Sequence, residues 1–219
     1  MAKNDLESPL YSPLNPSVYL ANQEKERAII RWIRKCEMEP LATKTLLDVG
    51  CGDGNDLLKF IQLGFRPENL VGVDLLEDRI ALCRSRLPEA TRTVCGDAAG
   101  LPLGSGQFDI VYLSRVFTSI LDDAFRAHLA ERAWRWTRFG GGVLIYDFVY
   151  NNPGNRDVKR LPLEAIRNLF PRSDIRAWRL TLAPPISRRV VLVHEALYNL
   201  LSSLHVLRTH MLCWVPKSR

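Results

Sequence analysis

Short apolar runs alternate with amphipathic stretches along most of this chain. A short apolar run between turn residues is typical of a buried strand, whereas apolar positions three or four residues apart are typical of a helix. Apolar runs predict strands at 45–50, 70–74, 91–95, 108–113, 143–148, 175–182 and 207–215. Helical spacing predicts helices at about 22–40, 55–63, 77–86, 122–139, 163–170 and 188–204, with Gly140–Gly142 ending the fourth of them.

This order of elements indicates the fold class. Strand–helix alternation over five units predicts parallel strands joined by right-handed crossovers, with helices on both faces of the sheet. The last two strands lack the alternation, so we expect the last strand to be antiparallel. The sequence therefore predicts an α/β fold, a doubly wound, Rossmann-like sheet of seven strands.

Two segments stand outside the simple alternation. Residues 1–40 begin with a proline-rich arm, and Asn22 is the expected N-cap of a helix that ends near Pro40. We expect this arm and helix to cover the functional site. Residues 41–219 then form the α/β domain, which carries a helical insert at about 183–206.

A glycine loop follows the first predicted strand, in the sequence LLDVGCGDG at 46–54. Glycines there let the backbone approach a ligand, and ligands of open α/β sheets bind at the carboxyl ends of the strands. Asp74 closes the second strand, 20 residues after Gly54. An acid at this place accepts hydrogen bonds from ribose hydroxyls, so the pattern predicts a nucleoside-containing cofactor.

Two features favour S-adenosylmethionine over a dinucleotide. The loop reads GxGxG, one residue shorter than the GxGxxG that binds a pyrophosphate. Asp48 lies just before the glycines, where its charge would repel a pyrophosphate and attract the amino group of a methionine moiety.

The order LLDVGCGDG, GVD, CGDAAGLPL, FDIV and GGGVLIYD resembles the class I S-adenosylmethionine-dependent methyltransferases, especially their type-11-like small-molecule branch. The resemblance covers 46–148 by motif and the rest by topology. It implies that Asp48, Gly50, Cys51 and Gly52 line the methionine end of the cofactor, that Asp74 binds the ribose, that Leu75, Asp97 and Ala98 contact the adenine, and that Ser114 lies beside the sulfonium.

The composition of the chain indicates its cellular compartment and the distribution of its charge. The first residues lack the apolar core of a signal peptide, and the five cysteines are scattered without a CxxC pair. We therefore expect a cytoplasmic protein with reduced thiols and no metal. Residues 111–219 contain 17 Lys+Arg and 8 Asp+Glu, net +9, whereas 1–110 contain 13 and 16, net −3. This asymmetry reflects either a solvated basic face or an anionic partner, for which a phosphorylated molecule, an acidic glycan, a membrane surface and nucleic acid all qualify.

Methylation of a hydroxyl needs a base to take its proton. The catalytic candidates are Asp147, at the end of the fifth predicted strand, and His194, in the helical insert. Each has a structural alternative, because Asp147 can cap the loop that follows it and His194 can be a hydrogen-bonded or a core-facing histidine without a catalytic role.

The acceptor is less specified than the cofactor. Base methyltransferases that act on adenine usually carry an Asn/Asp-Pro-Pro-aromatic motif where this chain reads LSRVF at 113–117, which argues against a nucleic-acid base. We expect O-methylation of a small or glycan-like acceptor that is anionic or lipid-linked. The insert is then a lid, a homodimer contact or a contact with an anionic membrane. The alternatives are a nicotinamide-dependent reductase, an aminopropyl transferase and a non-catalytic partner subunit that binds S-adenosylmethionine.

Overall fold

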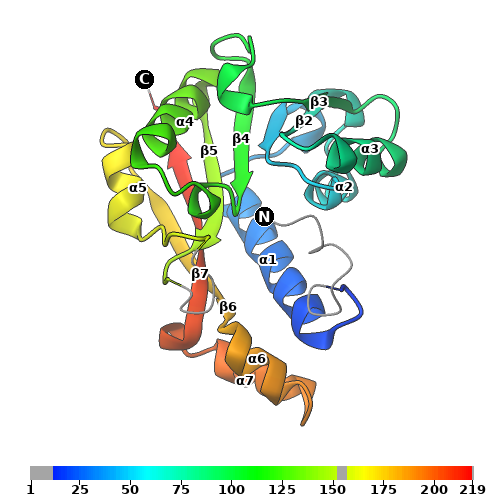
Figure 1. Ribbon diagram of the computed structural model, residues 1–219, viewed down its shortest axis with the longest axis vertical. Helices are drawn as coiled ribbons and strands as arrows, with labels where there is room; N and C mark the ends of the chain where they lie inside the picture. Colours follow the sequence, from blue (N-terminus) through cyan, green and yellow to red (C-terminus); the bar gives the residue numbers. More distant parts are fainter. Residues whose placement is uncertain (1–11, 152–156, 219) are drawn as a thin grey trace.

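The structure is a computed structural model that describes residues 12–151 and 157–218. A seven-stranded sheet forms its centre, with the order β3-β2-β1-β4-β5-β7-β6 (Figure 1). All strand pairs are parallel except those of β7, which runs antiparallel to β5 and β6. The strands are β1 (Leu46–Val49), β2 (Leu70–Asp74), β3 (Arg92–Cys95), β4 (Phe108–Ser114), β5 (Thr137–Phe148), β6 (Arg176–Leu182) and β7 (Arg208–Pro216).

Helices cover both faces of this sheet, which confirms the doubly wound α/β prediction (Figure 1). The helices are α1 (Pro16–Lys35), α2 (Asn55–Gln62), α3 (Glu77–Arg86), α4 (Asp123–Trp136), α5 (Leu163–Leu169), α6 (Pro184–Val190) and α7 (Glu195–Ser202). Short 3-10 turns are η1 (Leu41–Thr43), η2 (Pro67–Asn69), η3 (Ala98–Gly100), η4 (Phe117–Ser119) and η5 (His205–Leu207).

Each face of the sheet has its own core. Trp32 of α1 packs against Trp214 of β7 with ring centroids 5.1 Å apart, in a core that also holds Phe60 of α2. On the opposite face Trp136 of α4 and Phe170 lie in a second core. Burial of these large rings on both faces fixes the sheet as the central layer of the fold.

The first helix begins earlier than the sequence predicted. Asn15 is its N-cap, with its side chain accepting a hydrogen bond from the Ser17 N–H at 3.0 Å, and Pro16 takes the first helical position. Asn22 lies inside the helix, so its expected role as the cap was wrong. Proline at the first position loses no hydrogen bond, because that N–H has no partner within a helix.

The fifth strand is also longer than predicted. It starts at Thr137, directly after α4, and Gly140–Gly142 are part of it. A Cβ on Gly142 would lie 2.6 Å from the Trp214 ring. The glycines therefore allow β5 to approach β7 closely, and the helix ends at Trp136 without them.

The predicted helical insert consists of two helices, α6 and α7, packed against α1 (Figure 1). Glu24 of α1 is bonded to α7 through buried hydrogen bonds, accepting from the Tyr198 hydroxyl at 2.9 Å and from the Ser202 hydroxyl at 2.7 Å. Since β6 leads into α6 and is parallel to β5, these helices lie beyond the carboxyl edge of the parallel strands.

Candidate active site

The glycine loop turns at the carboxyl end of β1. The N–H groups of Gly50 and Cys51 donate to the Val73 carbonyl at 2.7 and 3.0 Å, which fixes the loop to β2. Gly50 and Gly52 both have positive φ, at 73° and 57°. A Cβ on Gly50 would lie 2.7 Å from Val116, whereas a Cβ on Gly52 would meet nothing within 4 Å. Gly52 therefore leaves open space over its backbone, as a bound cofactor requires.

Asp74 holds this loop from the end of β2. Its Oδ2 accepts the Gly52 N–H at 2.9 Å, and its Oδ1 accepts the Leu76 N–H at 3.0 Å. Its backbone carbonyl accepts the Gly96 N–H at 2.9 Å, which links the ends of β2 and β3. Leu75 beside it is 68% exposed, although it is a leucine. An apolar surface next to an acid at this edge fits an adenosine, with the ribose on Asp74 and the base on Leu75.

Asp48 and Ser114, two of the predicted cofactor residues, carry buried polar atoms that lack hydrogen-bond partners among the described residues. The Asp48 side chain is buried, with 1% exposed, and neither of its oxygens has a hydrogen-bond partner among the described residues. The buried hydroxyl of Ser114, at the end of β4, also has none among them. Burial raises the pKa of Asp48 well above its usual range, and the nearby Asp56 adds to the rise. A buried carboxylate is costly unless a cation pairs with it, so the site fits the amino group of a methionine moiety.

The remaining predicted cofactor residues differ in their side-chain roles. The thiol of Cys51 is buried, and a Cβ on Gly72 of β2 would lie 2.9 Å from it. A hydrogen bond with Cys83 and burial raise its pKa, so it stays a neutral thiol and offers the site only its backbone. Asp97 is exposed and caps η3, with its Oδ1 accepting from the Ala99 N–H at 3.0 Å, and Ala98 is buried. Their contacts with adenine stay predictions.

A buried ion pair that the sequence analysis missed lies on the α1 side of the loop. Lys25 of α1 places its Nζ 2.6 Å from Oδ1 of Asp56, in the first turn of α2, and the Tyr112 hydroxyl donates to Oδ2 of Asp56 at 3.2 Å. Burial alone would raise the pKa of Asp56, but Lys25 outweighs it and the pKa falls to about 2. Burial lowers the pKa of Lys25. The helical spacing of α1 gave no signal for this pair, because a lysine on an amphipathic helix is ordinarily exposed.

Arg115 and His210 are two further ionisable residues whose local structure is unusual. Arg115 follows Ser114 and has a φ of 59°, a left-handed conformation that is uncommon for a side-chain-bearing residue and clusters at functional sites. His210, on β7 opposite Phe148, is buried and stacked on the Tyr146 ring at 5.0 Å. Burial lowers the pKa of His210 to about 3, and the charges of Arg115 and Lys25 add to this, so its ring is neutral.

The structure favours a positioning role for Asp147 over proton transfer. Its carboxylate is 2% exposed and accepts hydrogen bonds from the Thr118 N–H at 3.2 Å, the Phe148 N–H at 3.0 Å and the Thr118 hydroxyl. Burial raises its pKa to about 6, against the effect of these bonds. Asp147 thereby fixes η4, the turn that follows Arg115, to the end of β5. Its role as a base stays a prediction.

His194 is likewise engaged in a local structure. It is exposed and caps α7, with its Nδ1 accepting the Ala196 N–H at 3.1 Å. The core-facing alternative was wrong, since the ring lies at the surface. A capping bond explains a histidine at this position without a catalytic role.

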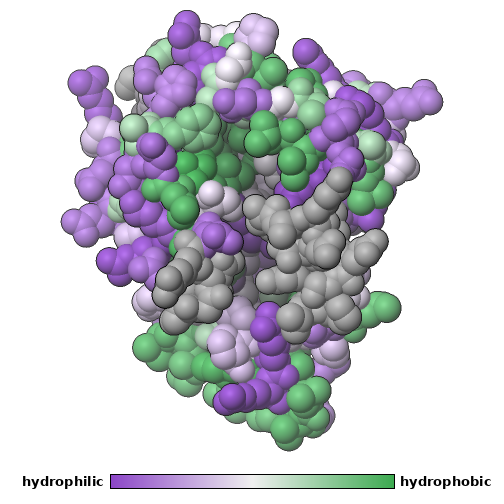
Figure 2. All heavy atoms as spheres, viewed as in Figure 1, coloured by the Kyte–Doolittle hydropathy of each residue, from purple (hydrophilic) through white to green (hydrophobic). Residues whose placement is uncertain are grey.

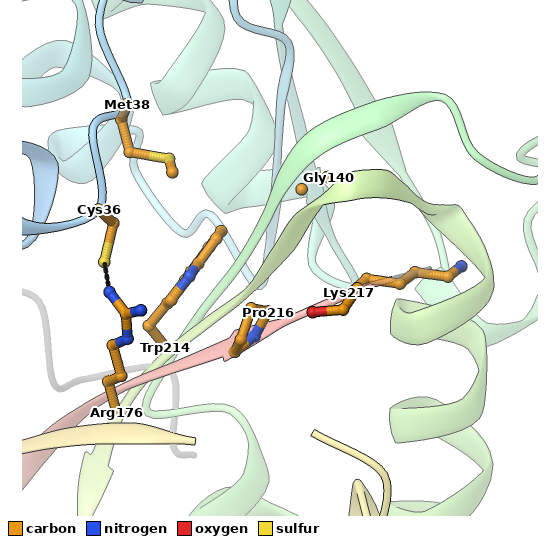
Figure 3. A pocket seen from close by; sticks show the side chains of 9 residues that line it. Cys36, Met38, Gly140, Arg176, Trp214, Pro216 and Lys217 are labelled. Carbon is orange, nitrogen blue, oxygen red and sulfur yellow. Dashed lines mark hydrogen bonds between the residues drawn. The ribbon is translucent and has the colours of Figure 1, made fainter. Parts of the chain in front are cut away.

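A cavity of about 210 Å³ lies at the opposite edge of the sheet (Figure 3). Cys36, Met38, Arg176, Trp214 and Lys217 are among its lining residues, with Arg176 donating to the Cys36 sulfur at 3.7 Å. The strands β5 and β6 begin at this edge, so the cavity is remote from the glycine loop. It is therefore no part of the candidate active site.

Within residues 12–151 and 157–218, no three side chains of His, Cys, Asp or Glu come together in a group that would hold a metal ion. In the same ranges no helix has the length and apolarity to cross a bilayer.

Comparison with known proteins agrees with this geometry. Residues 46–141 match a family model described as a methyltransferase domain. The match runs from β1 into β5 and so contains the glycine loop, Asp74 and Ser114. Residues 46–141 therefore form an S-adenosylmethionine-dependent methyltransferase domain. S-adenosylmethionine is the cofactor of such a domain, and the roles of the glycine loop and Asp48 in binding it stay predictions.

Two curated relatives match about half of the chain or more. The tRNA N(3)-cytidine methyltransferase METTL2 of Gallus gallus is 27% identical over 49% of this chain and 31% of its own length. The tRNA (carboxymethyluridine(34)-5-O)-methyltransferase alkbh8 of Xenopus tropicalis is 27% identical over 64% of this chain and 21% of its own. The chain thus spans less than a third of the length of these relatives. Since they are tRNA methyltransferases, they lend no support to the expectation against nucleic acid.

Solved structures show the same fold. A S-adenosylmethionine-dependent methyltransferase from Archaeoglobus fulgidus aligns with a TM-score of 0.60 at 15% identity, over 87% of this chain and 94% of that one. A phosphoethanolamine N-methyltransferase 2 of Haemonchus contortus, in complex with S-adenosyl-L-methionine, aligns with a TM-score of 0.63 at 18% identity, over 89% of this chain and 52% of that one. These alignments confirm the predicted fold, including its antiparallel β7.

Proposed function

We propose that this chain is an S-adenosylmethionine-dependent O-methyltransferase whose acceptor is a small or glycan-like, hydroxyl-bearing molecule with a negative charge. The observation that carries the methyltransferase assignment is the buried Asp48, which has no hydrogen-bond partner among residues 12–151 and 157–218, together with the open backbone of Gly52. A nicotinamide dinucleotide would bring a pyrophosphate to this carboxylate. The acidic residue therefore supports a methyltransferase over the reductase alternative.

S-adenosylmethionine supplies a methyl group already activated on a sulfonium, so the protein's main task is to hold an acceptor oxygen in line with it. Asp48 and the glycine loop hold the methionine end, and Asp74 holds the ribose. Asp147 fixes the turn η4 next to Ser114 and Arg115 through its bonds to Thr118. These residues provide the alignment of the acceptor with the methyl group.

The proposed charge of the acceptor comes from the residues around Arg115. Arg115 lowers the pKa of both Lys25 and His210, so cationic side chains gather on the α1 side of this edge. Lys25 is neutralised by Asp56, whereas Arg115 is exposed at the end of β4. An acceptor that carries a phosphate or a carboxylate would pair with the Arg115 guanidinium.

His210 is the better placed proton acceptor for a hydroxyl substrate. Nδ1 of its neutral ring pairs with the Thr209 hydroxyl at 3.1 Å, and in the tautomer that donates this bond the other ring nitrogen carries the lone pair. Asp147 and His194 are both engaged by hydrogen bonds of the fold. An anion bound at Arg115 would offset the charges that lower the pKa of His210 and so make the ring a stronger base. Transfer of the methyl carbon from sulfur to the acceptor oxygen would then release the hydroxyl proton to His210.

A second candidate acceptor is tRNA, and the two curated relatives are the observation that favours it. The name of one of them describes methylation of an oxygen on a carboxymethyluridine, which is an anionic acceptor on a larger carrier.

Methyl transfer from labelled S-adenosylmethionine tests these proposals against three acceptor sets: sugar phosphates and sugar acids, their neutral counterparts, and tRNA. We expect label in the anionic hydroxyl compounds. The variant Arg115→Ala should raise the KM for the acceptor and leave the KM for S-adenosylmethionine unchanged, and His210→Gln should lower kcat with little change in either KM. Label confined to neutral sugars or to tRNA would contradict the proposed acceptor.

A further inference from the structure

The helices α6 and α7 end in a surface that is apolar although it faces solvent. Leu192 and Val193, in the turn between the helices, are 85% and 76% exposed, and Leu200, Leu204 and Val206 are 51–77% exposed. We call these five residues the apolar tip. Figure 2 shows hydrophobic residues gathered over this end of the molecule, with hydrophilic residues among them. Large exposed aliphatic groups of this kind mark a contact surface.

The charges around the apolar tip have one dominant sign. Arg188 and Arg189, both exposed, stand at the end of α6, and Glu195 is the single acidic residue in 183–206. Glu24 of α1 contacts α7 as well, but its carboxylate is buried and accepts a hydrogen bond from Tyr198, so it does not face the solvent. An anionic surface would therefore meet cations and aliphatic side chains together at this end.

The inward face of the same helices is already satisfied. Tyr198 and Ser202 of α7 are buried against Glu24, and Ser187 of α6 is buried as well. Leu20, Leu182 and Tyr198 form a small core between α1, β6 and α7. The side chains of the apolar tip thus take no part in packing the helices against the domain. Packing therefore does not explain why aliphatic residues occupy these positions.

We propose that the apolar tip docks the protein onto an anionic lipid bilayer. The aliphatic side chains would enter the interfacial layer, and Arg188 and Arg189 would lie at the phosphate level. RNA is less favoured as the occupant because the exposed residues are aliphatic, whereas single-stranded RNA is bound by aromatic stacking. A second copy of the chain is less favoured because two such tips would bring their arginine pairs together.

Docking in this way would bring the active-site edge to the membrane. Leu182 ends β6 at the same edge as β5, and α6 starts at Pro184. On the return path η5 leads into Arg208, two residues before His210. The tip is therefore joined to the acceptor side of the site by very short connections. This part of the inference rests on the proposed function, and it implies an acceptor carried on a lipid.

Vesicle co-sedimentation of the whole chain tests the docking itself, independently of methyl transfer. The probes are vesicles of phosphatidylcholine alone and of phosphatidylcholine mixed with phosphatidylserine. We expect binding to the mixed vesicles, a loss on the order of tenfold in the partition coefficient for the double variant Arg188→Glu/Arg189→Glu, and a similar loss for Leu192→Asp/Val193→Asp.

Matched controls lie at the opposite edge of the sheet. Phe139 is exposed in the early part of β5, and Arg172 is exposed before β6. Phe139→Asp replaces an exposed apolar side chain by an acid, and Arg172→Glu reverses an exposed positive charge, as the tip variants do. Both should bind vesicles like the unaltered chain. Binding of S-adenosylhomocysteine should be the same in all variants, so a failure of docking is separate from a failure of the cofactor assignment.

Three outcomes would overturn the proposal. One is equal sedimentation of the unaltered chain with and without phosphatidylserine, or none with either. Another is a dimer in light scattering that Leu192→Asp/Val193→Asp converts to a monomer. The last is tRNA binding that depends on Arg188 and Arg189 in a chain that does not bind the mixed vesicles.

Discussion

The Gly52 N–H donates to Oδ2 of Asp74 at 2.9 Å, so the carboxylate expected to bind the ribose also sets the shape of the glycine loop. Its other oxygen accepts the Leu76 N–H. Asp74→Ala removes the acceptor of two backbone donors, which should cost about 2 kcal/mol of stability and weaken S-adenosylhomocysteine binding as well. Thermal unfolding and calorimetric titration measure the two effects. An unchanged affinity would contradict the assignment of Asp74 to the site.

In contrast to Asp74→Ala, a substitution of Asp48 should not lower the stability of the fold. Since its buried carboxylate has no hydrogen-bond partner among the described residues, Asp48→Asn should leave the Tm unchanged or raise it. The same change should weaken S-adenosylhomocysteine binding by about tenfold or more, because it removes a charge-assisted contact with the amino group.

Asp56→Asn is the matched control for Asp48→Asn. It leaves Lys25 buried without its charged partner, so it should lower stability by about 3–5 kcal/mol. A fall in Tm for Asp48→Asn as large as that for Asp56→Asn would show that Asp48 serves the fold rather than the cofactor.

Gly52 and Gly64 form a second matched pair. Both have positive φ, and a Cβ on either would meet nothing within 4 Å. Alanine at each position should therefore cost stability through backbone strain, of about 1–2 kcal/mol. Gly52→Ala alone should also abolish measurable S-adenosylhomocysteine binding in a titration, because its methyl group enters the cofactor space. Equal affinities in the two variants would place the cofactor elsewhere.

The strands were predictable from the sequence because short apolar runs bounded by turn residues are typical of buried strands. Its errors came from local competition. Asn15 and Asn22 are both good caps, and the choice of Asn15 depends on Pro16 at the first helical position. Gly140–Gly142 read as a helix stop, but they serve the contact between β5 and the Trp214 ring.

The cofactor side of the site was predictable because its residues are close together in the sequence, in the glycine loop at 46–54 and in Asp74. The other side was not, since Lys25, Arg115 and His210 are far apart in sequence and meet only through the packing of α1 and β7 on the sheet. Asp147 was found by its place at the end of β5. Its bonds to Thr118, which favour a structural role, could not be read from the sequence.

The raised pKa of Asp147 predicts an unusual pH dependence of stability. Its folded-state pKa of about 6 lies above the unfolded value near 4, so the folded state favours the protonated form. The stability that Asp147 contributes should be full below about pH 4 and should be lost as the pH rises through about 6. The Tm of the unaltered chain minus that of Asp147→Asn should thus decrease over this range. An increase would mean that hydrogen bonds from Thr118 lower the pKa of Asp147 instead.

Calorimetric titration of the unaltered chain with S-adenosylhomocysteine and, separately, with NADH tests the central claim most directly. We expect saturable 1:1 binding of S-adenosylhomocysteine and no heat of binding with NADH. Binding of NADH without binding of S-adenosylhomocysteine would contradict it, and the glycine loop, Asp48 and Asp74 would then belong to a dinucleotide site.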